Sequence, residues 1–208
     1  MKNFAPSVYI VDDDEAVRSS LRFLIRSVGL PAQVFASASD FLGAYDPRHP
    51  GCLLLDVRMP GMSGLDLQQE LNRRGATIPV VFITGHGDVP MAVAAMQHGA
   101  FDFLQKPFRD QDLLDRVQRA MARDAESRGR LAARTEILTR LDSLTPREKE
   151  VMQLVTRGKA NKVAGAELGV SQRTVEIHRA HVMEKMRAGS LAELVRMVLD
   201  SEEATQNP

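Results

Sequence analysis

Short, mostly apolar runs alternate with segments of helical periodicity over the first 122 residues. The runs are typical of strands buried on both faces of a parallel sheet, and they cover residues 8–11, 33–35, 52–56, 80–84 and 101–104. Between them, apolar residues recur every three or four positions, as one face of a helix requires, over residues 15–28, 39–45, 65–71 and 89–98 and again from residue 109. This alternation predicts an α/β fold with a (βα)5 doubly wound parallel sheet.

The pattern after residue 122 is helical throughout. Residues 123–142 are rich in Ala, Arg, Leu and Glu, which predicts a helical linker weakened near Gly129; a loose charged linker is the alternative. Residues 143–208 predict an all-α domain with four helices, and the Gly169 turn between the second and the third is typical of a helix-turn-helix. We therefore expect one domain at 1–122, the linker at 123–142 and a second domain at 143–208.

Composition and charge add two points. The chain has 27 basic and 27 acidic side chains, yet residues 1–122 carry 12 and 14 of them, net −2, while residues 143–196 carry 10 and 6, net +4. This asymmetry indicates different partners for the two halves. The single cysteine, Cys52, excludes a disulfide framework. No apolar run approaches the roughly 18 residues of a membrane span, so we expect a cytoplasmic protein with no membrane partner.

Polar side chains stand where the predicted strands of the first domain end. The adjacent carboxylates of Asp12 and Asp13 follow the first strand, Asp56 ends the third, Thr84 ends the fourth and Lys106 follows the fifth. The carboxyl ends of parallel strands meet at one edge of the sheet, so these groups should share one pocket. Clustered carboxylates favour a hard cation such as Mg²⁺, and a carboxylate can attack phosphorus to give an aspartyl phosphate.

These residues and the segments around them resemble the signature of response-regulator receiver domains. The similarity rests on Val11-Asp12-Asp13, Leu55-Asp56-Val57-Arg58-Met59-Pro60-Gly61, Thr84-Gly85-His86 and Lys106-Pro107-Phe108, in order and spacing. The resemblance implies that a cognate histidine kinase phosphorylates Asp56 and that Lys106 pairs with the phosphoryl group. It implies a Mg²⁺ ion held by Asp13, Asp56 and the backbone carbonyl of Arg58, with Asp12 nearby, and a switch pair formed by Thr84 and Phe103.

Two positions of this signature are expected to tune how long the phosphorylated state lasts. Arg58 lies two residues after Asp56, and His86 lies two residues after Thr84. Both would flank the place where an attacking water sits, so we expect them to set the lifetime of the phosphoryl group.

The third helix of the second domain, residues 172–186, is a candidate DNA-binding element. Thr145 and Glu148 form a capping-box pattern at the start of the domain, and Ser171 is the expected N-cap of this helix. Its polar face carries groups that can reach phosphates or base edges in a major groove. Charge alone indicates an ordinary solvated helix, because Glu176 and Glu184 dilute the positive face.

The sequence around that helix resembles the LuxR-type DNA-binding domain. The similarity is carried by Leu144-Thr145-Pro146-Arg147-Glu148, Thr174-Val175-Glu176-Ile177-His178-Arg179 and Met183-Glu184-Lys185-Met186. With the first domain it indicates a response regulator of the NarL/FixJ family, closest to the FixJ branch. The DNA contacts that it implies are Lys162, Arg173, Thr174, Glu176, His178, Arg179 and Lys185.

Two residues depart from the usual pattern of this family. Glu176 stands where many members have Lys, so it could accept a hydrogen bond from cytosine instead of pairing with a phosphate. Gly165 lies inside the second helix of the domain, where a glycine costs roughly 1 kcal/mol relative to alanine. We therefore expect Gly165→Ala to raise the melting temperature.

The expected function is that of a two-component transcription factor, not an enzyme. Phosphorylation of Asp56 should promote homodimerisation and binding to a promoter with paired half-sites, with RNA polymerase as a further partner. One alternative is a phospho-regulated protein-interaction module with a degenerate DNA-binding domain. The other is an aspartyl-phosphate phosphatase, although Arg58 stands where such an enzyme often places its general acid.

Overall fold

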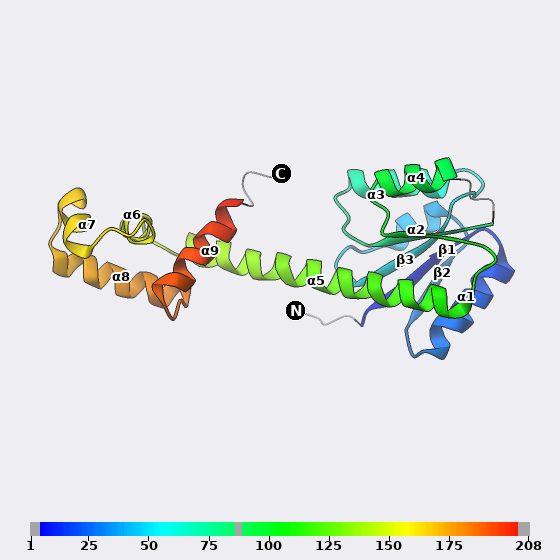
Figure 1. Ribbon diagram of the computed structural model, residues 1–208, viewed down its shortest axis with the longest axis horizontal. Coiled ribbons are helices and arrows are strands. Elements are labelled where there is room, and N and C mark those ends of the chain that lie inside the picture. Colours follow the sequence, from blue (N-terminus) through cyan, green and yellow to red (C-terminus); the bar gives the residue numbers. More distant parts are fainter. Residues whose placement is uncertain (1–4, 86–88, 204–208) are drawn as a thin grey trace. The chain divides into compact units, whose positions relative to one another are not determined.

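The chain divides into two compact units, the first ending at Arg128 and the second beginning at Gly129. The structure, a computed structural model, describes residues 5–85 and 89–203 (Figure 1). The α/β and all-α fold classes predicted from the sequence are confirmed. The expected domain boundaries at residues 122 and 142 remain a prediction.

A five-stranded parallel sheet forms the centre of the first unit. Its strands are β1 (Ser7–Val11), β2 (Ala32–Phe35), β3 (Gly51–Asp56), β4 (Val80–Thr84) and β5 (Asp102–Gln105), in the order β2-β1-β3-β4-β5. The order reverses direction at β1 and β3, so the polar ends of these two strands lie next to each other. Val11 pairs with Leu55, which places the residues that follow both strands at the same edge.

Alternate residues of each strand point to opposite faces of the sheet, and helices bury both faces. One face, with Val8 and Ile10, packs against α1 (Glu15–Ser27) and the beginning of α5 (Asp110–Asp142). The other face, with Tyr9 and Val11, packs against α2 (Ala38–Ala44), α3 (Gly64–Arg73) and α4 (Val89–Gln97). Two hydrophobic cores, one on each face of the sheet, therefore fix the strand ends that carry the candidate site.

The segment expected as a linker belongs to one long helix, α5, which continues through Gly129 without a break. Its residues on the first unit are anchored by a buried ion pair. Asp124, which is 1% exposed, accepts hydrogen bonds from Gly51 N at 2.9 Å and from Arg128 Nε at 2.7 Å. Arg128 also donates to the carbonyls of Pro47 and His49 at 2.9 Å each. The expected linker is thus helical, and its first residues are fastened to the loop that precedes β3.

The second unit contains the four expected helices, α6 (Pro146–Thr156), α7 (Asn161–Leu168), α8 (Gln172–Met186) and α9 (Leu191–Glu203). The capping box of Thr145 and Glu148 and the N-cap of Ser171 are both confirmed. Val175, Val182 and Met186 of α8 are buried against the other helices. Throughout the described ranges, no helix combines the length and the apolar character that crossing a membrane requires.

Candidate functional site

Three charged side chains predicted to meet at the sheet edge do so. Lys106 follows β5, and its Nζ lies 2.9 Å from Asp12 Oδ2 and 3.4 Å from Asp56 Oδ1. Asp12 is held from the other side by Asp14 N, which donates to Oδ1 at 2.9 Å. One ammonium thus bridges the carboxylates at the ends of β1 and β3.

The carboxyl group of Asp56 is buried but remains within reach of a ligand. The residue is 9% exposed, and its Oδ2 accepts a hydrogen bond from Arg58 N at 2.7 Å. Burial raises its pKa above the usual value, and the nearby Asp12 carboxylate raises it as well, while the Arg58 N–H and Lys106 oppose the shift. The site therefore holds a carboxylate whose charge is only partly compensated, which favours an additional cation.

Asp13 and Arg58 offer the remaining oxygens that a cation would need. Asp13 is exposed, and both residues line one pocket beside the end of β3. Arg18, which the sequence analysis did not single out, donates from Nη1 to the carbonyls of Asp12 at 2.7 Å and Asp13 at 2.8 Å. Arg18 fixes the backbone that presents the two carboxylates. The donor set is all oxygen, and this chemistry fits Mg²⁺.

The two expected switch residues lie on neighbouring strands. Thr84, at the end of β4, is 1% exposed, and its carbonyl accepts from Lys106 N at 2.8 Å. Phe103, on β5, is half-buried and packs near Phe82, with ring centroids 6.4 Å apart. Their roles as a switch pair remain a prediction. Arg58 is exposed, whereas His86, the other proposed determinant of lifetime, lies outside the described residues.

Gly64 has a structural role that its place in a turn did not reveal. A Cβ atom on this residue would lie 2.1 Å from the backbone oxygen of Asp56. Gly64 N also donates to Val57 O at 2.9 Å, which closes the loop after β3. Only a residue without a side chain allows the backbone after Asp56 to pass so close to the start of α3.

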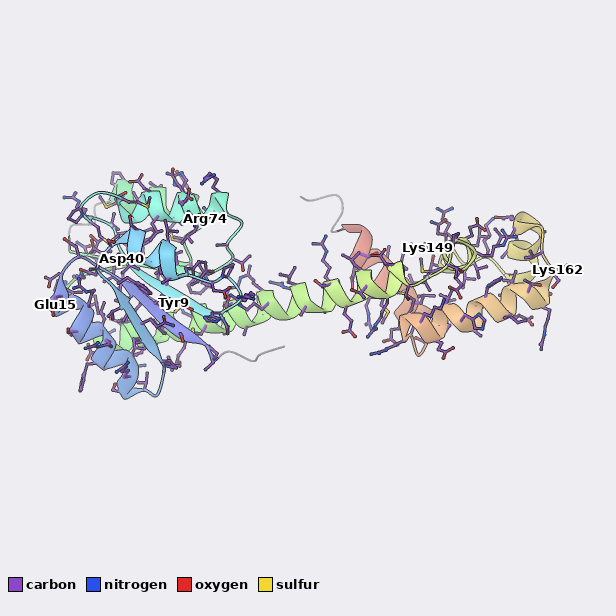
Figure 2. The ribbon with its side chains drawn as sticks, turned by 180° about the vertical axis from the view of Figure 1, so that it is seen from behind. Tyr9, Glu15, Asp40, Arg74, Lys149 and Lys162 are labelled. Carbon is purple, nitrogen blue, oxygen red and sulfur yellow. The ribbon has the colours of Figure 1, made fainter. Side chains whose placement is uncertain are left out.

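Several expected DNA contacts lie on accessible parts of α7 and α8. Lys162 extends from the start of α7 (Figure 2) and is exposed. The side chain of Arg173 is 84% exposed. Thr174 and Glu176 are half-buried and bond within their own helix turn, to Ser171 and Gln172. These positions leave the start of α8 open to an incoming ligand.

Other expected DNA contacts are already engaged within the second unit. Lys185 Nζ donates to Glu148 Oε2 at 2.7 Å and approaches Ser143 O at 3.4 Å. Arg179 donates to Asn161 Oδ1 at 3.3 Å, which ties α8 to α7. The Nδ1 atom of His178 is buried. A DNA phosphate would have to compete with Glu148 for Lys185.

The expectation for Gly165 is wrong. A Cβ atom at this position would lie 2.8 Å from the backbone oxygen of Val170, closer than real contacts of this kind. Val170 N donates to Gly165 O at 2.9 Å, so the turn folds back directly onto the helix. The glycine allows this close packing, and its low helix propensity is not the deciding effect.

Comparison with known proteins identifies both units. Residues 8–118 match the family model described as the response regulator receiver domain, and residues 142–198 match the one described as bacterial regulatory proteins, luxR family. The Nodulation protein W of Bradyrhizobium diazoefficiens is 52% identical over 91% of this chain and 84% of its own length. The transcriptional regulatory protein FixJ of Azorhizobium caulinodans is 50% identical over 92% and 91%, respectively.

Solved structures show the same similarity. The response regulator StyR superposes with a TM-score of 0.87 at 46% identity and covers 94% of this chain and 98% of its own. Full-length FixJ from B. japonicum superposes with a TM-score of 0.59 at 40% identity, and the match covers 97% of this chain and 99% of the FixJ chain.

Proposed function

The chain belongs to the response regulators that combine a receiver domain with a LuxR-type DNA-binding domain, and on this basis we propose that phosphorylation of Asp56 controls its binding to DNA. Members of this family are transcriptional regulators, not enzymes, so the phosphatase alternative is set aside. The receiver domain implies a histidine kinase as the phosphoryl donor, and the second domain implies DNA as the target. We propose that this protein works in the cytoplasm, where the DNA that it would bind lies.

The observation that carries the proposal is the bridge from Lys106 to Asp56 and Asp12. In the proposed step, a carboxylate oxygen of Asp56 forms a bond to phosphorus while the bond from phosphorus to the kinase histidine breaks. The imidazole leaves and takes up a proton. Lys106 Nζ lies 3.4 Å from Asp56 Oδ1, and in this proposal it would neutralise the charge on the transferred group.

A Mg²⁺ ion would supply further charge neutralisation at this edge when bound. Asp13, Asp56 and the carbonyl of Arg58 would hold it, with Asp12 nearby. Asp12 is engaged by Lys106, whereas Asp13 is exposed and lines a pocket together with Arg58.

The response is proposed to run through Thr84 and Phe103. The Thr84 hydroxyl would bond a phosphoryl oxygen, and Phe103 would turn inward against the core that already contains Phe82. This change would reshape the face that includes α4 and favour a homodimer, a shift between pre-existing states. Two copies of α8 would then reach half-sites about one DNA turn apart, in a position to recruit RNA polymerase.

A gel shift against promoter fragments, with and without acetyl phosphate as the donor, tests the proposal. We expect tighter DNA binding after phosphorylation in the wild-type chain and no response to the donor in Asp56→Asn. Asp46→Asn is the matched control, because Asp46 is bonded to Arg48 far from the sheet edge and should leave the response intact. If Asp56→Asn still responded to the donor, or if neither form of the wild type bound DNA, the proposal would be wrong.

A further inference from the structure

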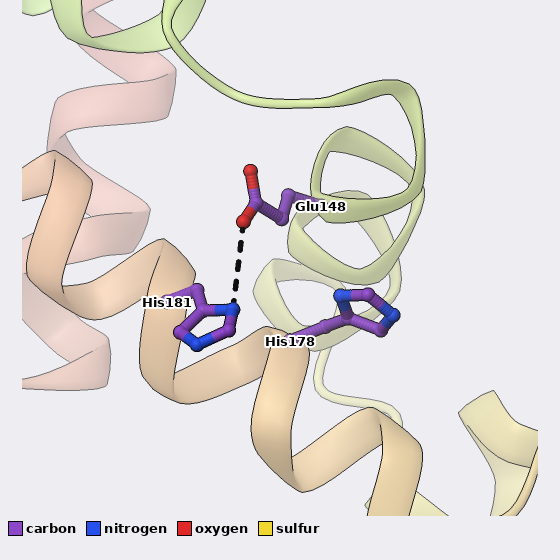
Figure 3. Close-up of side chains that lie close together, drawn as sticks. All are labelled: Glu148, His178 and His181. Carbon is purple, nitrogen blue, oxygen red and sulfur yellow. Dashed lines mark ion pairs between the residues drawn. The ribbon is translucent and has the colours of Figure 1, made fainter.

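Two histidines and a glutamate converge in the second unit, away from the phosphorylation site. Glu148 comes from the first turn of α6, and His178 and His181 lie three residues apart on α8, on one side of the helix. One potential ligand atom from each of the three lies within 4.8 Å of the others. Figure 3 shows the carboxylate of Glu148 above the two imidazole rings that α8 presents toward α6.

The carboxylate of Glu148 is fixed so that one of its oxygens faces the histidines. The side chain is 4% exposed, and Oε2 accepts from Lys185 Nζ at 2.7 Å and Thr145 N at 2.8 Å. The other oxygen, Oε1, lies 3.7 Å from His181 Nδ1, which is too long for a hydrogen bond. Donors on one oxygen orient the carboxylate and leave the other available, as the outer partners of metal ligands commonly do.

His178 supplies a second and independent sign of a missing partner. Its Nδ1 atom is buried and has no hydrogen-bond partner within the described parts of the chain. Leaving a buried polar atom without a partner is unfavourable, so such an atom in a folded protein calls for an explanation. A ligand positioned between His178, His181 and Glu148 would provide one.

We propose that Glu148, His178 and His181 bind a transition-metal cation, with Zn²⁺ as the best match, and that this cation links α6 to α8. Two imidazoles and one carboxylate, with a water in the fourth position, form a well-known tetrahedral set for Zn²⁺. Ligand atoms around such an ion lie about 3.4 Å apart, so the 3.7 Å between His181 and Glu148 needs only a small side-chain adjustment. The nitrogen ligands disfavour Mg²⁺, which prefers oxygen.

The ammonium of Lys185 is the main opposing charge. It remains on Oε2, on the other side of the carboxylate from the proposed ion, but its repulsion lowers the affinity. Metal binding would stiffen the helix that carries the expected DNA contacts. The site thus adds a metal-dependent control of the DNA-binding unit that does not depend on Asp56.

Titration of the full-length chain with Co²⁺, in the presence of saturating Mg²⁺, tests the proposal. Co²⁺ bound to two nitrogens and one carboxylate should give strong tetrahedral absorption bands, whereas the all-oxygen site at the sheet edge gives weak octahedral ones. We expect one tetrahedral Co²⁺ per chain, displaced by Zn²⁺, and at least a roughly tenfold weaker affinity in His181→Asn, the loss of one ligand. His181 is 52% exposed, so this variant should fold normally.

His98→Asn is the matched control, since His98 is an exposed histidine bonded to Ala94 O in the first unit. It should bind Co²⁺ as the wild type does. Zn²⁺ should also raise the melting temperature of the wild type and of His98→Asn but not of His181→Asn. Absence of tetrahedral bands in the wild type, or equal affinity in the wild type and His181→Asn, would overturn the proposal and leave an ordinary network of Glu148 with Lys185.

Discussion

Each unit contains a buried carboxylate beside a lysine, and the two pairs behave in opposite ways. Asp56 lies 3.4 Å from Lys106, which it shares with Asp12, and burial raises its pKa. Glu148 lies 2.7 Å from Lys185, and the hydrogen bond from this lysine, helped by the Thr145 N–H, lowers its pKa to about 2. The comparison indicates that reactivity requires a carboxylate whose negative charge is only partly neutralised. Asp56 is such a carboxylate and can still bind a cation or accept a phosphoryl group. Glu148 Oε2, by contrast, already accepts hydrogen bonds from Lys185 and from Thr145 N.

The difference between the two carboxylates depends first on the position of the backbone that carries Asp56. Gly64→Ala places a Cβ atom 2.1 Å from Asp56 O, and no flexible side chain can yield to relieve the clash. We expect a loss of about 3 kcal/mol in the unfolding free energy of the first unit, from overpacking. Urea unfolding followed by tyrosine fluorescence measures it, because both tyrosines, Tyr9 and Tyr45, lie in this unit.

Gly61→Ala is the control for backbone strain without a clash. Gly61 has φ +78°, and nothing lies within 4 Å of a Cβ atom there. It should lose only about 1 kcal/mol, the cost of a left-handed residue. Equal losses in the two variants would show that the close approach to Asp56 O is not what makes Gly64 necessary.

Replacing each lysine by methionine tests the contrast between the two carboxylate–lysine pairs directly. Lys106→Met should slow phosphorylation of Asp56 by acetyl phosphate about 100-fold, because the charge of the transferred group loses its neutralising partner. Lys185→Met removes a lysine of the same kind from the other pair and should leave the phosphorylation rate unchanged. Gel separation of the phosphorylated and free chain over time gives both rates. A similar loss of rate in both variants would contradict the assignment of Lys106.

The ion pair of Glu148 and Lys185 predicts that the second unit becomes less stable in acid. The folded pKa of Glu148, about 2, lies below its usual 4.5, so the stabilisation is fully present above about pH 4.5 and is lost as the pH falls toward 2. Calorimetry of the wild type should show this unit losing melting temperature across that window. Glu148→Gln should start about 2 kcal/mol less stable, because its amide oxygen can still accept from Thr145 N but the negative charge that pairs with Lys185 is lost. It should also lack this pH dependence. An unchanged acid profile in Glu148→Gln would exclude this source.

The sequence predicted the edge that holds Asp12, Asp56 and Lys106 because parallel strands must end together. It also predicted the bounds of α8 to the residue, since the Gly169 turn before it and the Ser171 cap are local signals. It missed Arg18 and the anchor formed by Asp124 and Gly51, because the latter joins positions 73 apart and no local pattern encodes it. Helical spacing placed Lys185 on a polar face but could not identify Glu148 as the neighbour of that face.

Gly165 gives the smallest effect and the sharpest test of local against tertiary reasoning. Helix propensity alone predicts that Gly165→Ala gains about 1 kcal/mol. The structure predicts a net loss of about 1 kcal/mol, because the added Cβ would lie 2.8 Å from Val170 O and the turn that leads into α8 would have to shift. Calorimetry on this variant measures the sign. Gly129→Ala is the control: Gly129 lies inside α5 with nothing within 4 Å of a Cβ atom, so this variant should show the propensity gain without a clash. A higher melting temperature in Gly165→Ala would show that the backbone at Val170 moves away from the added Cβ at little cost. The close packing of this turn against α7 would then not be what makes the glycine necessary.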